Sequence, residues 1–270
     1  VIAGSDSGGG AGIQADIKTV TALGGYAATA ITAVTVQNTL GVTGVHPIPL
    51  EVIAAQARAV LDDIGADAIK TGMLGDVGVV ETVAAAIDHA GKVPVVVDPV
   101  MIAKGGASLL DPDAVDALKT ELLPLATLLT PNLPEAAALL GVGEALDRMA
   151  MAEQGAALLA LGPAAVLVKG GHLEGPESPD VLVSGEATHW FEAPRVVTKN
   201  THGTGCSLSS AIAAGLAKGL PPAEAVAAAK SWLAGAVAAS GNLSVGSGHG
   251  PVHHFHVLWE ESPRASSNRV

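Results

Sequence analysis

Short β-branched runs alternate with amphipathic segments along nearly the whole chain, and this alternation constrains the fold more than any other feature. Residues 93–97 form a continuous apolar run, which is typical of a strand buried on both faces of a parallel sheet. We expect further strands at 1–4, 27–36, 67–71, 127–130 and 165–168. Two turn-flanked runs near 180–192 favour an antiparallel pair. The pattern predicts an α/β fold, a doubly wound, mostly parallel sheet with helices on both faces, in three α/β/α layers.

Capping signals locate some of the intervening helices. Asp76 can cap a helix that ends at Gly91, and Asp111 followed by Pro112 is a typical helix start. Apolar residues at helical spacing predict another helix at 53–64, and we expect the last third of the chain to be helical.

No long linker or internal repeat interrupts the alternation, so we expect one domain over residues 1–261. Residues 262–270 are rich in Ser, Arg and Asn and are expected to form a mobile tail. Hydrophobic residues make up 49% of the chain and aromatic residues only 2%, so Ala, Val, Leu and Ile must build the core.

Charge and hydropathy exclude several classes of partner. A net charge of −12 argues against nucleic acid, because phosphate backbones are bound mainly through Lys and Arg. Apolar stretches are interrupted before the roughly 18 residues of a membrane span, and Lys230 interrupts the main candidate at 223–239. A single cysteine and no evident signal peptide indicate a cytoplasmic protein. The chain opens without Met inside a predicted strand, so we expect further residues before Val1.

A glycine-rich turn near residue 200 precedes a helical stretch of small residues. Gly203 and Gly205 let successive backbone N–H groups point into one concavity at a helix N-terminus, where the helix dipole favours an anion. Thr201 and Thr204 add hydroxyl donors, and Cys206 in the first turn is expected to have a lowered pKa. An ordinary glycine turn capping a core helix is the structural alternative, but these neighbours favour a phosphate site.

Ligands of doubly wound sheets lie beyond the carboxyl ends of the strands, so the strand ends are where binding residues are expected. The glycine-rich stretch 4–12 is similar to a dinucleotide-binding loop, but no acidic residue closes a second strand about 20 positions later, which disfavours an oxidoreductase. Gln37 presents a donor and an acceptor side by side, as the edge of an aminopyrimidine requires. An amide that only orders its loop explains Gln37 equally well.

Three further strand ends carry charged or amide groups. Asp98 would hold Mg²⁺ directly or through water, or simply form an Asp-Pro turn. Asn132 and Glu135 have capping-box spacing, and a Glu at that edge could also bind a hydrated metal. Lys169, beside two glycines, would suit a polyphosphate, although a surface lysine is the commoner outcome.

Taken together, these motifs resemble the hydroxymethylpyrimidine/phosphomethylpyrimidine kinases of thiamine biosynthesis, within the ribokinase-like superfamily. The match runs from Ala3 to His256. The stretches that carry it are 12–16, 36–39, 70–74, 98–101, 130–135, 169–172 and 201–206. The resemblance implies that Gln37 reads the pyrimidine edge and that the ring pocket is shaped by Gly4, Asp16, Met73 and Val100.

The resemblance also implies how the phosphates are held. Backbone amides from Gly203 to Cys206 would stabilise the charge on the transferred phosphoryl group, and Lys169 would approach the ATP phosphates. Asn132 would contribute to the nucleotide site together with Thr201, and would act with Glu135 on Mg²⁺ through water. Many members of the wider superfamily have Asp as the base where this chain has Cys206, which leaves the identity of the base open.

The implied activity is Mg²⁺-dependent transfer of the ATP γ-phosphoryl group to 4-amino-5-hydroxymethyl-2-methylpyrimidine and then to its monophosphate. Phosphorylation of pyridoxine or pyridoxal is the alternative among kinases, because that ring is also a small heteroaromatic with a hydroxymethyl arm. A non-catalytic nucleotide- or pyrimidine-sensing module is disfavoured, since a sensor needs no phosphoryl-transfer residues. Members of this family are commonly homodimers, so we expect one here.

Overall fold

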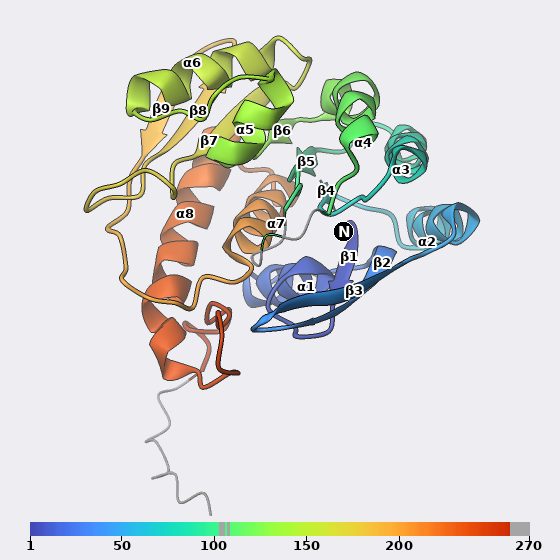
Figure 1. Ribbon diagram of the computed structural model, residues 1–270. Helices are drawn as coiled ribbons and strands as arrows, with labels where there is room; N and C mark the ends of the chain where they lie inside the picture. Colours follow the sequence, from blue (N-terminus) through green and yellow to red (C-terminus); the bar gives the residue numbers. More distant parts are fainter. Residues whose placement is uncertain (103–105, 107–108, 260–270) are drawn as a thin grey trace, which may run out of the picture.

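The strands join into one nine-stranded sheet in the computed structural model, which describes residues 1–102, 106 and 109–259 (Figure 1). The strands are β1 (Ile2–Asp6), β2 (Ala30–Asn38), β3 (Gly41–Pro47), β4 (Ile69–Thr71), β5 (Val95–Val97), β6 (Leu128–Leu129), β7 (Ala165–Lys169), β8 (Asp180–Ser184) and β9 (Thr188–Phe191). Their order in the sheet is β3-β2-β1-β4-β5-β6-β7-β8-β9. The six strands from β2 to β7 in this order run parallel, whereas β3, β8 and β9 pair antiparallel with their neighbours. The predicted mostly parallel sheet is confirmed, including the antiparallel pair near 180–192.

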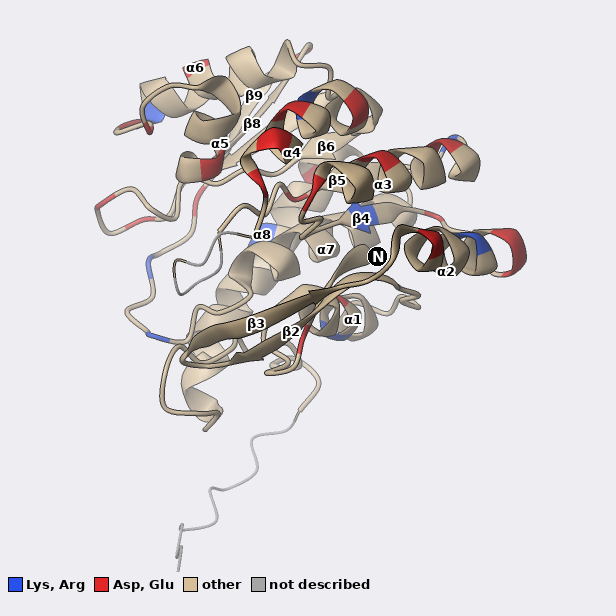
Figure 2. Ribbon diagram, turned by 45° about the vertical axis from the view of Figure 1, so that its right-hand side comes forward, with Lys and Arg blue, Asp and Glu red and all other residues tan. Residues whose placement is uncertain are grey.

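Helices cover both faces of this sheet. They are α1 (Gly12–Ala22), α2 (Leu50–Asp63), α3 (Val77–Ala90), α4 (Pro112–Ala117), α5 (Leu133–Leu140), α6 (Arg148–Leu159), α7 (Thr204–Ala217) and α8 (Pro222–Ala238), with short helical turns η1 (Leu118–Leu122), η2 (Leu123–Leu125) and η3 (Ala239–Asn242). In Figure 1, α1, α7 and α8 lie on one face and α2 to α6 on the other. Asp and Glu, coloured red on the ribbon of Figure 2, occur along α2, α3 and α4 and account for part of the negative charge.

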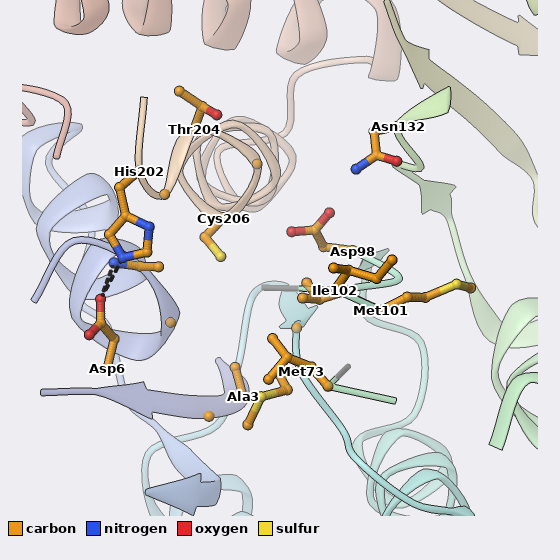
Figure 3. Close-up of a pocket in the computed structure, with 18 of the residues that line it drawn as sticks. Ala3, Asp6, Met73, Asp98, Met101, Ile102, Asn132, His202, Thr204 and Cys206 are labelled. Carbon is orange, nitrogen blue, oxygen red and sulfur yellow. Dashed lines mark hydrogen bonds and ion pairs between the residues drawn. The ribbon is translucent and has the colours of Figure 1, made fainter. Parts of the chain in front are cut away.

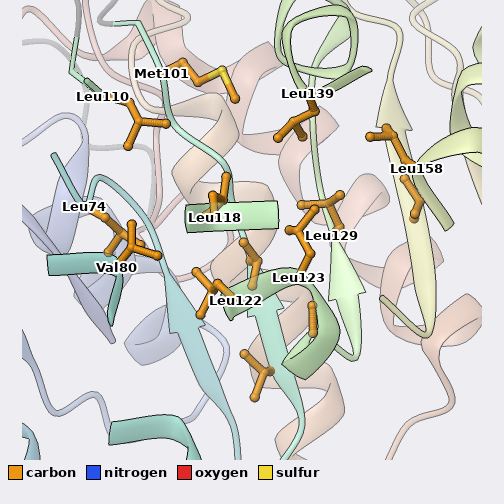
Figure 4. Close-up of a cluster of buried hydrophobic side chains, with 14 of the residues drawn as sticks. Leu74, Val80, Met101, Leu110, Leu118, Leu122, Leu123, Leu129, Leu139 and Leu158 are labelled. Atoms are coloured by element: carbon orange, nitrogen blue, oxygen red, sulfur yellow. The ribbon is translucent and has the colours of Figure 1, made fainter. Parts of the chain in front are cut away.

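Alternate residues of one strand enter different cores, which is the direct sign of a sheet buried on both faces. In β5, Val95 and Val97 pack into the cluster under α2 to α6, whereas Val96 packs against α7 and α8. The larger cluster consists mainly of Leu, Val, Ile and Ala (Figure 4), as the scarcity of aromatic residues required. The three-layer prediction is therefore confirmed.

The helix signals were also largely correct. Asp76 caps α3 by accepting a hydrogen bond from the backbone N–H of Val79 at 2.9 Å, and Gly91 ends the helix with φ of 74°. Pro112 occupies the first turn of α4. The helical part of the last third ends at Asn242, however, and 243–259 has no helix, so that expectation held only in part.

Other expectations were missed or lie outside the described residues. Strand β3 was not predicted, because its sequence contains two glycines and ends in Pro, both of which disfavour strands. The tail proposed for 262–270 lies outside the described residues. Among the residues that are described, no helix is both long and apolar enough to cross a bilayer.

Candidate active site

A cavity of about 360 Å³ lies at the carboxyl ends of the central parallel strands (Figure 3). Nearly every candidate residue from the sequence lines it. These are Gly4, Gln37, Met73, Asp98, Val100, Asn132, Glu135, Lys169, Thr201, Gly203, Thr204, Gly205 and Cys206. In Figure 3, Asp6 and His202 lie on one side, Asp98 and Asn132 on the other, and Cys206 between them. The carboxyl ends of parallel strands meet at one edge, so positions as far apart in sequence as Gly4 and Cys206 converge here.

The N-terminus of α7 forms one wall of the cavity. Its N-cap, Gly203, has φ of 78°, and a Cβ added there would collide with the backbone carbonyl of Gly10. Only glycine fits both constraints. An α-helix leaves the N–H groups of its first turn without intrahelical acceptors, so the turn at Thr204 to Cys206 has the properties of an anion site.

Gly205 differs from Gly203, because its φ is not in the left-handed region. A Cβ added at Gly205 would lie 3.5 Å from Lys169 Nζ and 3.7 Å from Asp98 Oδ2, which are ordinary contact distances. A larger side chain would therefore extend toward the gap between the lysine and the carboxylate without disturbing the backbone. Gly205 keeps open the space between the helix N-terminus and the charged groups.

Lys169 and Asp98 form an ion pair of 2.9 Å at the ends of β7 and β5. Burial opposes the charge on Asp98, but the neighbouring ammonium groups of Lys169 and Lys70 more than offset it, so its pKa lies below the usual value. Thr130 Oγ1 also donates to the Asp98 carboxylate at 3.3 Å. Ser209 Oγ lies 3.3 Å from Asp98 Oδ2 but closer to the backbone oxygens of Gly205 and Cys206, at 3.0 and 3.1 Å. The sequence placed both charges at this edge but did not predict that they pair.

Glu135 and Asn132 form the predicted capping box of α5. Asn132 Oδ1 accepts from the Glu135 backbone N–H, and Glu135 Oε2 accepts from the Asn132 N–H, both at 2.8 Å. Glu135 Oε2 also lies 3.9 Å from Lys169 Nζ. Burial raises the pKa of Glu135 to about 7, with Lys169 opposing the shift and Asp98 adding to it.

These groups provide only oxygen atoms for a metal, as Mg²⁺ prefers. Within residues 1–102, 106 and 109–259, no cluster of three or more His, Cys, Asp or Glu could hold an ion by itself. Two carboxylates and an amide around one cavity fit an ion that keeps most of its water and is held partly by substrate phosphates.

The opposite end of the cavity is mostly apolar. Met73 and Val100 line it, and Gly4 leaves the room that the Met73 methyl group occupies. The Gln37 amide is a polar group beside them, with Thr35 Oγ1 at 3.1 Å from Oε1 and His202 Nε2 at 3.2 Å from Nε2. A small flat ring with one hydrogen-bonding edge fits such a wall.

Asp16 is the exception among the predicted site residues. Its side chain is fully buried and does not line the cavity. Lys70 Nζ donates to both of its oxygens at 3.0 and 3.1 Å, and Ser210 Oγ donates at 2.7 Å. The position on α1 turns the carboxylate toward α7 and β4, so Asp16 supports the site from behind instead of lining the cavity.

The expected reactivity of Cys206 is also corrected. Burial raises the pKa of its thiol to about 11, although the nearby Lys70 ammonium acts in the opposite direction. The helix dipole alone would have lowered the pKa, but desolvation of the thiolate outweighs it. Cys206 is therefore a neutral thiol at neutral pH.

Two residues that sequence reasoning missed form a buried pair beside Gln37. His202 Nε2 lies 3.0 Å from Asp6 Oδ2, and both side chains line the cavity. Asp6 also orders the glycine-rich loop by accepting from the backbone N–H groups of Gly8, Gly10 and Ala11 at 2.7 to 3.0 Å. An acid opening a glycine-rich loop and a histidine inside the anion motif were the available signals.

A second cavity of about 350 Å³ adjoins the first. Its apolar lining includes Val196, Leu208, Leu233 and Val237. The residues common to both cavities are Asn132, Lys169, His172, Thr201, Thr204 and Gly205. One ligand could therefore extend from the second cavity past Lys169 to the helix N-terminus.

Comparison with known proteins gives consistent results. The sequence profile described as phosphomethylpyrimidine kinase matches residues 6–253. The hydroxymethylpyrimidine/phosphomethylpyrimidine kinase of Rhizobium meliloti (strain 1021) is 53% identical over 260 residues, covering 96% of this chain and 97% of that protein. An ADP complex of Bacillus subtilis pyridoxal kinase superposes with a TM-score of 0.88 at 40% identity, covering 95% of this chain and 96% of that one. The structure of the phosphomethylpyrimidine kinase of Clostridium difficile 630 superposes with a TM-score of 0.76 at 41% identity. The match covers 86% of this chain and 95% of that one.

Proposed function

The chain belongs to the phosphomethylpyrimidine kinase family, and from this premise we propose how its site works. The protein is an ATP-dependent kinase that phosphorylates 4-amino-5-hydroxymethyl-2-methylpyrimidine and then the resulting monophosphate, in thiamine biosynthesis. The observation that carries the division of roles is that two cavities meet at Asn132, Lys169 and Gly205. One cavity is lined by Met73, Val100 and the Gln37 amide, and the other, of about 350 Å³, has apolar residues in its lining and room for a nucleobase.

In this proposal the pyrimidine ring packs against Met73 and Val100, with its edge on Gln37. The nucleoside of ATP occupies the second cavity, and its phosphates extend past Asn132, Lys169 and Thr201, which line both cavities. The γ-phosphoryl group then lies between the first turn of α7 and the hydroxymethyl oxygen of the substrate. Once both reactants are bound next to each other, they lose little further translational and rotational entropy on reaching the transition state.

The N-terminus of α7 and Lys169 supply the electrostatic stabilisation. Backbone N–H groups from Gly203 to Cys206 would hold the equatorial oxygens of the transferred group, and Thr204 adds a hydroxyl. Lys169 would exchange part of its contact with Asp98 for a phosphate oxygen, since Lys169 and Asp98 both border the space in front of Gly205.

Mg²⁺ would be held by Asp98, Asn132 and Glu135, largely through water, and when bound it neutralises charge on the phosphates. Cys206 remains protonated at neutral pH, so it would shape the pocket rather than remove the hydroxymethyl proton. A loose phosphoryl transition state depends more on positioning and electrostatics than on a strong base. We also propose a cytoplasmic location, which a single cysteine suits, and a homodimer, which the family resemblance implies.

Pyridoxal is the second candidate substrate, because the Bacillus subtilis pyridoxal kinase superposes with a TM-score of 0.88. A coupled ADP-release assay with hydroxymethylpyrimidine, its monophosphate and pyridoxal in parallel tests the proposal. We expect the two pyrimidines to be turned over with the higher kcat/KM. Gly205→Val is the matched inactive control, because its side chain occupies the transfer space. Turnover of pyridoxal alone, or full activity in Gly205→Val, would contradict the proposal.

A further inference from the structure

His202 Nε2 contacts two groups that make opposite demands on it. It lies 3.0 Å from Asp6 Oδ2 and 3.2 Å from the atom assigned as Gln37 Nε2. A ring nitrogen carries either one hydrogen or one lone pair. The Asp6 carboxylate can only accept, so it requires the hydrogen on His202 Nε2, whereas an amide N–H of Gln37 would require the lone pair. Asp6 Oδ2 also accepts from the Gly10 and Ala11 N–H groups, which fixes it in place.

Thr35 Oγ1 has the converse difficulty at the other end of the same amide. It lies 2.9 Å from the backbone oxygen of Ser5 and 3.1 Å from the atom assigned as Gln37 Oε1. Both neighbours are acceptors, and a hydroxyl has one hydrogen. The carbonyl of Ser5 cannot donate, so the Thr35 hydrogen serves it, and the group facing Thr35 from Gln37 should be a donor.

Turning the Gln37 amide by 180° removes both conflicts at once. The oxygen and nitrogen of an amide have nearly the same shape, so the turn changes no packing. Gln37 Oε1 then accepts from His202 Nε2–H, which it shares with Asp6. Gln37 Nε2–H then donates to Thr35 Oγ1, whose hydrogen remains on Ser5 O.

We propose that Asp6, His202 and Thr35 fix the orientation of the Gln37 amide, and that this orientation determines which ring edge the site accepts. Each amide atom retains one free group, a lone pair on oxygen toward the His202 side and a hydrogen on nitrogen toward the Thr35 side. A matching ligand donates beside His202 and accepts beside Thr35. Resting on the proposed function, this places the 4-amino group near His202 and ring nitrogen N3 near Thr35.

The same argument gives an exclusion. In the 4-oxo analogue of the pyrimidine, the carbonyl accepts and the N3–H donates, so the order along the edge is reversed. Buried polar groups left unpaired cost free energy, so the fixed amide should discriminate against this edge. His202 and Thr35 are positioning residues in this scheme, acting on the ligand through Gln37.

The first experiment determines the His202 tautomer by ¹⁵N NMR of the wild-type protein, with the resonance assigned by its loss in His202→Phe. We expect hydrogen on Nε2. An unprotonated Nε2 at neutral pH would overturn the proposal, because the Gln37 amide would then be free to donate to it. This measurement requires no turnover and is independent of the proposed function.

The second experiment compares dissociation constants for hydroxymethylpyrimidine and its 4-oxo analogue. The wild type should favour the amino compound by about tenfold or more. The ratio should fall toward one in Thr35→Val, which keeps the shape of the side chain, and in His202→Phe, and should recover in Thr35→Ser. Thr43→Val removes a hydroxyl that donates to a backbone carbonyl on the same hairpin, away from the cavity, and should leave the ratio unchanged. Equal weakening of both ligands in Thr35→Val would overturn the proposal.

The two proposals fail separately. If the wild type releases ADP with hydroxymethylpyrimidine but does not distinguish the two edges, the orientation argument is wrong and the kinase assignment stands. If the tautomer and the selectivity are as expected but no ADP is released, the kinase assignment is wrong.

Discussion

Two of the buried lysine–aspartate pairs, Lys70–Asp16 and Lys169–Asp98, lie near the same edge of the sheet in opposite surroundings. The closed pair, Lys70–Asp16, has side chains that are 1% and 0% exposed, and Lys70 donates to both oxygens of its partner. The open pair, Lys169–Asp98, has side chains that are 12% and 2% exposed and faces the cavity. Glu135, at 3.9 Å from Lys169, is a further partner for the open pair.

The difference shows how one ion-pair chemistry serves two purposes. Burial opposes the charge on Lys70, but Asp16 more than offsets it, so the pKa of Lys70 lies above its usual value. Both charges of the closed pair are balanced within the protein. In the open pair, the lysine can turn to a ligand because Asp98 retains a hydroxyl donor from Thr130. The closed pair should therefore control stability, and the open pair activity.

Breaking the closed pair should give the largest effect. In Asp16→Asn the ammonium of Lys70 remains buried without its counter-charge, and we expect the free energy of unfolding to fall by about 3–5 kcal/mol. Urea denaturation measures this. Asp62→Asn, which removes an exposed partner of His89, is the control and should cost less than about 1 kcal/mol. If Asp16→Asn lowered the free energy of unfolding as little as the control does, the distinction between the closed and open pairs would be wrong.

Breaking the open pair should affect catalysis instead. Lys169→Met keeps most of the side-chain volume but removes the charge that stabilises the transferred phosphoryl group, so we expect kcat to fall by about 10²–10³-fold. The free energy of unfolding should fall by less than in Asp16→Asn. Steady-state kinetics tests the loss of kcat, and urea denaturation of the same preparation tests the change in stability. Full activity with a large loss of stability would reverse the assignment.

Glu135 should give the open pair a pH dependence that the closed pair lacks. With a pKa raised to about 7, the carboxyl is charged for Mg²⁺ only as the pH rises through that value, so kcat/KM for ATP should show an acidic limb near pH 7. In Glu135→Gln the acidic limb should be absent, and kcat/KM for ATP at pH 8 should be about tenfold lower than in the wild type.

The raised pKa of Glu135 also predicts the direction in which the free energy of unfolding changes with pH. Native Glu135 holds its proton up to about pH 7, whereas the ordinary value is 4.5, so the native state binds more protons in that window. The free energy of unfolding of the wild type, relative to Glu135→Gln, should therefore fall as the pH rises from 4.5 to 7 and then level. A relative stability that rises with pH would contradict the raised pKa.

Cys206→Ser should have the smallest effect. The thiol has a pKa of about 11, so little thiolate exists at neutral pH to act as a base. We expect kcat to change by less than about tenfold, the limb near pH 7 to persist, and iodoacetamide to label the single cysteine slowly. Mass spectrometry measures the labelling directly. Rapid labelling would contradict the raised pKa, and loss of the acidic limb with the thiol would make Cys206 the base.

Much of the site was predictable, because parallel strands bring their carboxyl ends to one edge whatever their separation in sequence. Gln37, Asp98, Glu135 and Lys169 each follow a recognisable strand, and all of them line the cavity. The capping box of Asn132 was also visible, since it depends on residues only three positions apart.

The tertiary structure alone decided how these groups act. Sequence pattern gives Asp16 and Asp98 the same chemistry, but whether a carboxylate turns into the core or into a cavity depends on the packing of α1 and β5 against α7. The Cys206 thiol lies where a helix dipole should lower its pKa, yet burial by distant segments raises it to about 11. His202 meets Gln37 across 165 positions of sequence. Local sequence pattern determines which groups reach the edge of the sheet, because strands and helix caps are formed by neighbouring residues. Desolvation and hydrogen-bond partners depend on residues distant in sequence, so only the tertiary structure determines them.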